Sequence, residues 1–256
     1  MKIAAIQTSL HWEDRDANLA MLSQKISSAK EANLIVLPEM FATGFSMNTA
    51  IAEDAHDGPS VLWMKRQAQE KNAAVCGSLM VKDGNDFYNR MYFVTPEQTF
   101  TYDKRHLFSL ANEQDFYRQG GSQLVVEYSG WKIAPLVCYD LRFPVWSRRS
   151  ETFDYDALVY VANWPERRSL AWRSLLVARA IENQAYVVGM NRVGRDGNDV
   201  IHSGDSAVVD PMGRYIAQAR PFGEEIIVTE LSKELLESTR KELPFYNDRD
   251  GFEIRM

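Results

Sequence analysis

The sequence is short of several features that mark whole classes of protein. It has only two cysteines, Cys76 and Cys138, which are too few for the disulfide framework of a small secreted domain. The four histidines stand apart, and none has the spacing to a cysteine or to another histidine that a zinc site requires. No run approaches the roughly 18 consecutive apolar residues of a membrane-spanning helix. We therefore expect a protein of the reducing cytoplasm, without metal, cofactor or membrane contact.

Positive charge is also in short supply. Lys and Arg number 29 against 35 Asp and Glu, which gives a formal net charge of −6. No basic stripe supplies the phosphate neutralisation on which nucleic-acid binding depends. A nucleic-acid-binding module is therefore disfavoured, and a salt-dependent affinity for DNA or RNA would revive it. The balance of 45% apolar and 25% charged residues is that of an ordinary globular domain.

Hydrophobic patterns predict alternating helices and strands. No repeat or linker interrupts the chain, so we predict one domain over residues 1–256, with a core of about 3–231 and a C-terminal helix and tail over 232–256. Apolar residues recur at helical spacing over 14–29 and 168–183, and helices are also expected from Ser60, as N-cap, to about Lys71 and after Ser232. Strands are predicted over 2–8, 34–37, 73–81, 88–95, 99–103, 123–128, 131–137, 157–162, 185–191, 206–210, 214–219 and 225–231. This order favours a mixed α/β sandwich with the sheets inside and the helices outside.

Unusual polar residues follow three of the predicted strands. Glu39 comes after a buried apolar strand, at the end where α/β sheets bind ligands. Lys104 follows another strand, and Cys138 ends a third and opens a turn that contains Asp140 and Arg142. Each alone has an ordinary explanation as a solvated charge or an inert core thiol. Cys138 differs because the chain leaves the core there, in the partly exposed, positively charged setting that favours a thiolate.

Together these three residues match one pattern. Glu39, Lys104 and Cys138, separated by 65 and 34 residues, resemble the Glu-Lys-Cys triad of the nitrilase superfamily of carbon–nitrogen hydrolases. The likeness extends from about residue 3 to 231. It includes Pro38-Glu39, Lys104-x-His106-Leu107, Cys138-Tyr139-Asp140-x-Arg142-Phe143-Pro144, Asn163-Trp164-Pro165, Arg179-Ala180-x-Glu182-Asn183-Gln184 and Gly204-Asp205-Ser206. Three motifs in the order and at the spacing of this family strongly indicate that the resemblance is not a chance match.

The resemblance implies a mechanism. A cysteine thiol attacks an amide or nitrile carbon in this family, so Cys138 would be the nucleophile and Glu39 the general base. Lys104 and the backbone N–H of Tyr139 would stabilise the tetrahedral oxyanion. Glu113 lies where many members carry a second glutamate and would orient Lys104 or the leaving ammonia, and a surface glutamate is the competing interpretation. Ammonia would leave an acyl-thioester on Cys138, which water then hydrolyses.

The surroundings of the triad look most like the omega-amidase branch, which hydrolyses 2-oxoglutaramate to 2-oxoglutarate and ammonia. The segments Phe41–Phe45 and Cys138–Pro144 carry this likeness. Such a substrate is a small anion, so we expect a cation in the pocket. Arg142 is the candidate for bidentate binding of the carboxylate, and a buried salt bridge that shapes the turn is its alternative role. The candidate pocket walls are Tyr139, Phe41, Phe45 and Trp164, although aromatic side chains more often belong to the core.

The resemblance also implies a four-layer α-β-β-α sandwich whose members commonly pair through the outer helices. The helix over 168–183 and the C-terminal segment are therefore candidate surfaces of a homodimer or a higher homo-oligomer. The other partner implied is a small-molecule amide. Alternatives that keep the triad are another short aliphatic amidase, an N-carbamoyl amino acid hydrolase or a nitrilase. A non-catalytic scaffold would lack a reactive Cys138. Because the triad needs no histidine base, His106 is expected to be structural.

Overall fold

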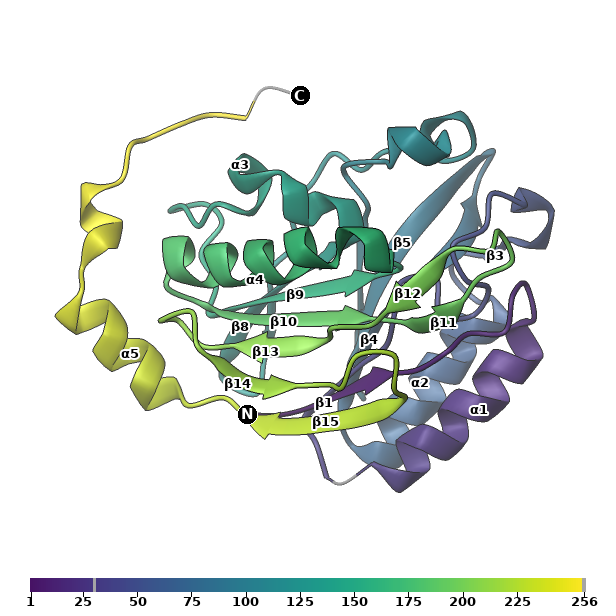
Figure 1. Cartoon of the computed structure of the whole chain (residues 1–256), viewed down its shortest axis with the longest axis horizontal. Coiled ribbons are helices and arrows are strands. Elements are labelled where there is room, and N and C mark those ends of the chain that lie inside the picture. The colour runs from purple at the N-terminus through teal and green to yellow at the C-terminus, as the bar shows by residue number, and fades with distance from the viewer. Residues whose placement is uncertain (30, 255–256) are drawn as a thin grey trace.

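The computed structural model describes residues 1–29 and 31–254, and it is a sandwich of two β-sheets with helices on both outer faces (Figure 1). The strands of the first sheet are β1 (Lys2–Gln7), β2 (Leu34–Val36), β3 (Glu53–Asp54), β4 (Ala74–Asp83), β5 (Asp86–Val94), β6 (Thr99–Asp103) and β15 (Glu225–Glu230). The strands of the second are β7 (Val126–Tyr128), β8 (Trp131–Val137), β9 (Ala157–Ala162), β10 (Tyr186–Asn191), β13 (Ala207–Val209) and β14 (Tyr215–Gln218). A short hairpin joins β11 (Val193–Arg195) to β12 (Ile201–Ser203). The helices are α1 (Arg15–Ser28), α2 (Pro59–Lys71), α3 (Pro144–Ser147), α4 (Ser169–Asn183) and α5 (Lys233–Glu242).

The layers follow from the alternation of side chains along the strands. In β1, Ile3 and Ala5 belong to the core that the two sheets share, whereas Ala4 and Ile6 belong to the cluster that includes α1 and α2. The strand order is β15-β1-β2-β4-β5-β6, with β3 beside β4, in one sheet and β14-β13-β10-β9-β8-β7 in the other. With α4 over the outer face of the second sheet, the layers are α-β-β-α, which confirms the predicted fold class (Figure 1).

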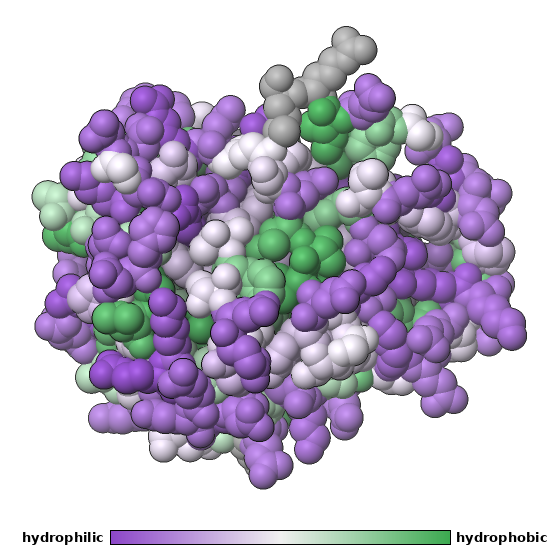
Figure 2. Space-filling view, turned by 180° about the vertical axis from the view of Figure 1, so that it is seen from behind, coloured by the Kyte–Doolittle hydropathy of each residue, from purple (hydrophilic) through white to green (hydrophobic). Residues whose placement is uncertain are grey.

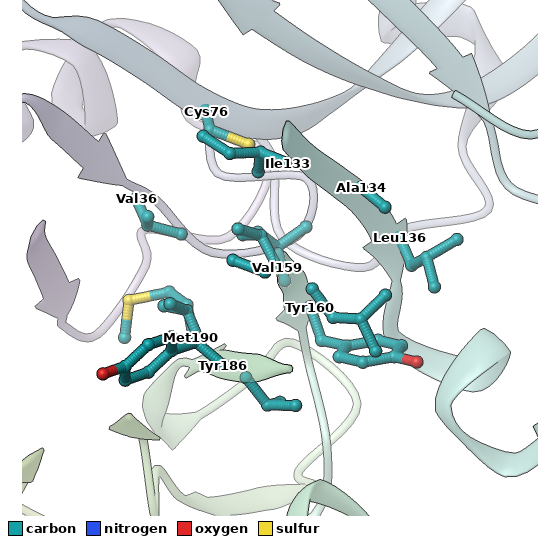
Figure 3. Close-up of a cluster of buried hydrophobic side chains, with 14 of the residues drawn as sticks. Val36, Cys76, Ile133, Ala134, Leu136, Val159, Tyr160, Tyr186 and Met190 are labelled. Carbon is teal, nitrogen blue, oxygen red and sulfur yellow. The ribbon is translucent and has the colours of Figure 1, made fainter. Parts of the chain in front are cut away.

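Apolar side chains from both sheets meet in the shared core. Val36 and Cys76 of the first sheet lie across from Ile133 and Val159 of the second (Figure 3). Cys76 is fully buried, and burial raises the pKa of its thiol. Its sulfur lies beside the sulfur of Met91, 3.5 Å away, among apolar side chains. This cysteine is therefore part of the hydrophobic packing.

The strand directions bring several strand ends to the same edge of the sandwich. Strands β1, β2 and β4 are parallel, and so are β8, β9 and β10. Strand β6 has the direction of β4, because each is antiparallel to β5. Glu39, Lys104, Cys138 and Asn163 follow β2, β6, β8 and β9 respectively. Their side chains can therefore meet although they are far apart in sequence.

The helix starts are predicted with mixed success. Ser232 is the N-cap of α5, and its Oγ accepts a hydrogen bond from the backbone N–H of Leu235 at 3.1 Å. The N-cap predicted for α2 is wrong, because the cap is Gly58 and Ser60 lies inside the first turn. There the carboxylate of Glu53 accepts hydrogen bonds from the backbone N–H of Ser60 at 2.7 Å and from its Oγ at 2.6 Å. A side chain from β3 thus satisfies the helix start in place of a local cap.

The C-terminal segment lies outside the four layers. Helix α5 runs along one end of the sandwich, and the chain continues beyond it (Figure 1). Arg240 on α5 donates hydrogen bonds to the backbone oxygens of Gln184 and Tyr155, which attach the helix to the body. Seen from behind, the surface is mostly hydrophilic with small hydrophobic groups between (Figure 2). In the described part of the chain, no helix has the length and apolarity to cross a membrane.

Candidate active site

A pocket of about 380 Å³ opens at the edge where these strands end. Glu39, Lys104 and Cys138 all line it. The structure therefore brings together the three residues that the sequence predicts as a triad. A cavity of this size with several polar groups converging on one wall is the usual form of a site for a small molecule.

Cys138 lies at a strained turn of the backbone. It follows β8 directly, begins the 3₁₀ turn Cys138–Arg142, and has a φ of +43°. For a residue other than glycine, this left-handed conformation costs about 1–2 kcal/mol. The side chain is half-buried and lines the pocket. Because the first N–H groups of a helical turn have no partner within that turn, the N–H of Tyr139 is available at the same place.

A buried carboxylate holds this turn against the segment that carries Lys104. Asp140 accepts hydrogen bonds from the Tyr102 hydroxyl at 2.7 Å and from the backbone N–H of Val137 at 3.1 Å. It also accepts one from the backbone N–H of His106 at 3.0 Å, and its Oδ1 lies 2.8 Å from Nδ1 of the same histidine. Residues on both sides of Lys104 are thereby attached to the turn that starts at Cys138. His106 lies outside the pocket lining, as its predicted structural role requires.

Glu39 is fully buried, and its carboxylate is surrounded by donors. Its Oε1 accepts hydrogen bonds from Lys104 Nζ at 2.9 Å and from Asn89 Nδ2 at 2.8 Å. Its Oε2 accepts one from the backbone N–H of Asn163 at 2.8 Å. The Asn163 side chain also donates to the backbone oxygen of Glu39 at 2.6 Å. Such a carboxylate has a fixed orientation, which a general base needs.

Lys104 is equally buried and lies between two carboxylates. Its Nζ is 2.9 Å from Glu39 Oε1 and 2.9 and 3.0 Å from the two oxygens of Glu113. Burial lowers the pKa of Lys104, but the charges of Glu113 and Glu39 more than reverse this, so the pKa is raised. The lysine therefore keeps its positive charge at the wall of the pocket.

Glu113 has no exposed surface, which contradicts the interpretation of a surface glutamate. Besides Lys104, it accepts hydrogen bonds from the backbone N–H of Phe108 at 2.5 Å and from Asn89 Nδ2 at 3.2 Å. Burial raises the pKa of Glu113, with the negative charge of Glu39 adding to the effect and Lys104 opposing it. Glu113 is absent from the pocket lining, so it contacts Lys104 rather than the space for a substrate.

The environment of Cys138 keeps the resting thiol protonated. Burial is the largest cause, and the charge of Glu39 and a hydrogen bond with it further raise the pKa of the thiol, while Lys104 lowers it. The thiol proton and the Glu39 carboxylate are thus neighbours. This pairing suits a nucleophile that loses its proton to Glu39 as it attacks.

Positive charge dominates the rest of the pocket. Arg142, Arg167 and Arg168 line it, and none of the three forms a salt bridge in residues 1–29 and 31–254. The Arg142 guanidinium carbon lies 4.7 Å from the ring centre of Trp164, and that of Arg168 lies 5.0 Å from the ring of Phe108. The structure therefore contradicts the alternative role of Arg142 as a buried salt bridge.

Three of the four predicted aromatic walls are in place. Phe45, Tyr139 and Trp164 line the pocket. Phe41 does not, and its prediction as a pocket wall is wrong. Its fully buried ring packs in the core of the first sheet and α2, with its centre 5.7 Å from that of Trp63. Although only Met40 separates it from Glu39, the chain turns at that residue, whose φ is +43°, and the two side chains point to different places.

Several residues of the site were not predicted. Asn89, Asn163 and Asp140 each bind a site residue or the nucleophile turn. The motif around Asn163 and the position of Asp140 beside Cys138 were signals in the sequence, but no role followed from them. Asn89 lies inside β5 and carries no local signal at all. Asp196 and His202, from the β11–β12 hairpin, also line the pocket.

Sequence comparisons place this chain beside amide-hydrolysing enzymes. The family model for carbon-nitrogen hydrolases matches residues 2–241. An omega-amidase (YafV) of Escherichia coli K12 is 46% identical over 255 residues, which are 99% of this chain and 98% of that protein. A 2-oxoglutaramate amidase of Bacillus subtilis is 34% identical and covers 86% of each chain.

Solved structures agree with these sequence relatives. A CN-hydrolase superfamily protein of Xanthomonas campestris, with an arsenic adduct in its active site, has a TM-score of 0.96. The two sequences are 40% identical, and the match covers 100% of this chain and 99% of that one. Nit3 of Saccharomyces cerevisiae, a member of the nitrilase superfamily, has a TM-score of 0.85 at 26% identity, covering 95% and 94% of the two chains.

Proposed function

Because the chain belongs to the carbon–nitrogen hydrolase family and is an amide hydrolase, we propose that it converts 2-oxoglutaramate and water to 2-oxoglutarate and ammonia. Two relatives support this substrate through their names, omega-amidase and 2-oxoglutaramate amidase. The observation that carries the proposal is a pocket that joins Glu39, Lys104 and Cys138 to arginines with no salt bridge to any described residue. The first group suits amide cleavage, and the arginines suit an anionic substrate.

The reaction begins with attack of the Cys138 sulfur on the amide carbon. Glu39 accepts the thiol proton, and a tetrahedral intermediate forms with negative charge on the former carbonyl oxygen. The charged Lys104 and the N–H of Tyr139 stabilise that oxygen. In other enzymes, one such donor contributes about 2.7–4 kcal/mol of transition-state stabilisation. Glu113 acts through Lys104, because it fixes the position and charge of the ammonium group.

Collapse of the intermediate breaks the carbon–nitrogen bond. Glu39 returns its proton to the leaving nitrogen, so ammonia departs and an acyl-thioester remains on Cys138. Water then donates a proton to Glu39 and attacks the thioester carbonyl. The second tetrahedral intermediate uses the same oxyanion contacts. In its collapse the carbon–sulfur bond breaks, the carboxylic acid leaves, and Glu39 returns its proton to the Cys138 sulfur.

The arginines supply recognition of the far end of the substrate. Arg142 lies four residues after the nucleophile and is half-buried, with its guanidinium carbon over the ring of Trp164. A guanidinium group in such a position binds a carboxylate through two parallel hydrogen bonds. A neutral amide offers no charge to this group, so the pocket favours monoamides of dicarboxylic acids.

The test compares substrates that share a cleavable carbon–nitrogen bond. Ammonia release is measured with 2-oxoglutaramate, with an N-carbamoyl amino acid and with an aliphatic nitrile. We expect 2-oxoglutaramate to have the highest kcat/KM. A higher value for the N-carbamoyl amino acid, which also carries a carboxylate, would replace the proposed substrate and keep the Cys138 chemistry.

We also propose that the chain forms a homodimer through the outer face of α4. Leu170 and Ile181 on this helix are exposed, with 72% and 51% of their surfaces accessible. Burial of such side chains against a second copy removes apolar surface from water. Light scattering tests this with the variant Leu170→Glu, which we expect to be a monomer. A monomeric unsubstituted chain at micromolar concentration would refute the proposal.

A further inference from the structure

Of the three arginines that line the pocket, Arg168 is placed over an aromatic ring, as Arg142 is. Its carbon Cζ lies 5.0 Å from the ring centre of Phe108. The backbone N–H of Phe108 in turn binds Glu113, the carboxylate that holds Lys104. Phe108, whose ring lies under Arg168, is therefore linked through Glu113 to Lys104, which is proposed to stabilise the oxyanion.

Trp164 connects the two arginines. Its ring lies beneath Arg142, while its indole N–H donates a hydrogen bond of 2.8 Å to the backbone oxygen of Arg168. The short turn from Trp164 to Arg168 thus has a fixed shape. Both guanidinium groups lie over aromatic rings, and among the described residues neither donates a hydrogen bond, so their N–H groups can bind an anion.

Arg168 lies among positive charges, and Asp196 is the one carboxylate besides Glu39 among the described residues that line the pocket. Burial lowers the pKa of Arg168, and the positive charges of Arg167 and Arg142 lower it further. In the described residues no carboxylate forms a salt bridge with any of these three arginines. Like charges held close together in a partly buried pocket repel one another, and a bound anion relieves that repulsion.

We infer that Arg168 is a specificity-determining residue that, together with Arg142, binds the carboxylate of the substrate from a second side. This inference rests on the proposed function, since it assigns a further residue to the same anionic substrate. A carboxylate has about four lone-pair positions, enough for two guanidinium groups at once. A pair of arginines also raises the preference for an anionic over a neutral amide, because only a bound anion relieves their mutual repulsion.

The experiment measures kcat/KM for 2-oxoglutaramate and for pentanamide, a neutral amide with a chain of the same length. The variants are Arg168→Gln, Arg168→Lys and Arg142→Gln, with Arg66→Gln as control, because Arg66 is an exposed arginine on α2. A lost hydrogen bond between charged groups predicts that Arg168→Gln lowers kcat/KM for 2-oxoglutaramate about 10- to 100-fold, mainly through KM. The loss for pentanamide should be at least about tenfold smaller. Arg168→Lys should restore part of the loss, because it keeps the charge without the planar donor pair.

The outcomes separate the two proposals. Equal losses on both substrates, or no loss on either, would overturn the role of Arg168. If Arg142→Gln removes the preference for the carboxylate and Arg168→Gln does not, the proposed function stands and the inference fails. If the unsubstituted enzyme itself shows no preference for 2-oxoglutaramate over pentanamide, the proposed function and the inference both fail.

A second measurement does not depend on turnover. Calorimetry follows the binding of the product 2-oxoglutarate to Cys138→Ala, with and without Arg168→Gln. We expect the dissociation constant to rise about 10- to 100-fold with the second substitution. An unchanged dissociation constant would contradict a contact between Arg168 and the carboxylate.

Discussion

The substitution Glu113→Gln tests how the buried charges cooperate. Lys104 and the carboxylates of Glu39 and Glu113 form a cluster without contact to solvent. Glutamine has nearly the same shape as glutamate, so the change removes one negative charge and leaves the packing intact. Lys104 keeps its ion pair with Glu39 and therefore stays charged.

The contacts of Glu113 give the size of the effect. One of its oxygens accepts from Lys104 and Asn89, and the other accepts from Lys104 and the backbone N–H of Phe108. Whichever way the glutamine amide points, its NH₂ group faces donors instead of accepting from them. A lost charged hydrogen bond costs about 1.5–3 kcal/mol. If about 2–3 kcal/mol of this is lost from the transition state, kcat falls about 30- to 150-fold.

The assay combines steady-state ammonia release with thiol alkylation. We expect kcat to fall and KM to change little, because Glu113 does not line the pocket. Since the charge of Glu113 raises the pKa of Cys138, the substitution should lower that pKa and speed alkylation by iodoacetamide at a fixed pH below it. Glu127→Gln is the matched control, because Glu127 is an exposed glutamate on β7.

Two results would refute the reasoning. A kcat within about threefold of the unsubstituted enzyme would mean that Lys104 needs no second carboxylate. A higher KM at unchanged kcat would place Glu113 in substrate binding rather than in positioning Lys104. Urea unfolding shows whether the variant is folded in either case.

The other predictions concern three basic residues that line the pocket. Lys104→Ala should lower kcat about 100- to 1,000-fold with a smaller effect on KM, and an unchanged kcat in ammonia release would exclude an oxyanion role. Arg142→Lys should lose more kcat/KM on amides that carry a carboxylate than on neutral amides, whereas equal losses would indicate a purely structural role. Burial and the nearby Arg192 lower the pKa of His202 from 6.5 to about 4, so its neutral form is favoured in the folded state. The neutral His202 should therefore contribute fully to the free energy of unfolding above pH 6.5, and this contribution should disappear as the pH falls to about 4. Urea unfolding midpoints measured over this pH range test this. A decline in His202→Gln equal to that of the unsubstituted protein would contradict the prediction.

The parts of the site that could be predicted are those with a local signal. Three strands, β6, β8 and β9, have the predicted bounds, because each is a distinct β-type run followed by a polar residue. Lys104 and Cys138 stand directly after two of them. Sequence therefore located the groups of the proposed chemistry, while the resemblance supplied their roles.

The parts that could not be predicted depend on how distant segments pack. Asn89 lies within β5, where nothing in the local sequence distinguishes it from its neighbours. Only the pairing of β5 with β4 and β6 brings its side chain to Glu39. The sequence predicts Phe41 as a pocket wall because it follows Glu39 closely, but its side chain packs in the core beneath α2. Arg168 marked only the start of a predicted helix, and its place in the pocket follows from the turn before α4.

Several of the shortest strands could not be predicted from the sequence either. Strands β3, β11 and β12 have only two or three residues each, too few for a pattern of alternation. The strand predicted over 123–128 is confined to β7, since only its last three residues pair with β8. These differences leave the main layers unchanged, but Glu53 of β3 binds the first turn of α2, and the β11–β12 hairpin supplies one wall of the pocket.

The central claim is that Cys138 carries the acyl group during hydrolysis. The most direct test mixes the enzyme with 2-oxoglutaramate, quenches with acid within the first turnovers, and finds the modified peptide by mass spectrometry. We predict an added mass equal to that of the substrate less ammonia on the peptide with Cys138, present in Cys76→Ala and absent, together with ammonia release, in Cys138→Ala. Ammonia release that persists in a folded Cys138→Ala variant would contradict the account.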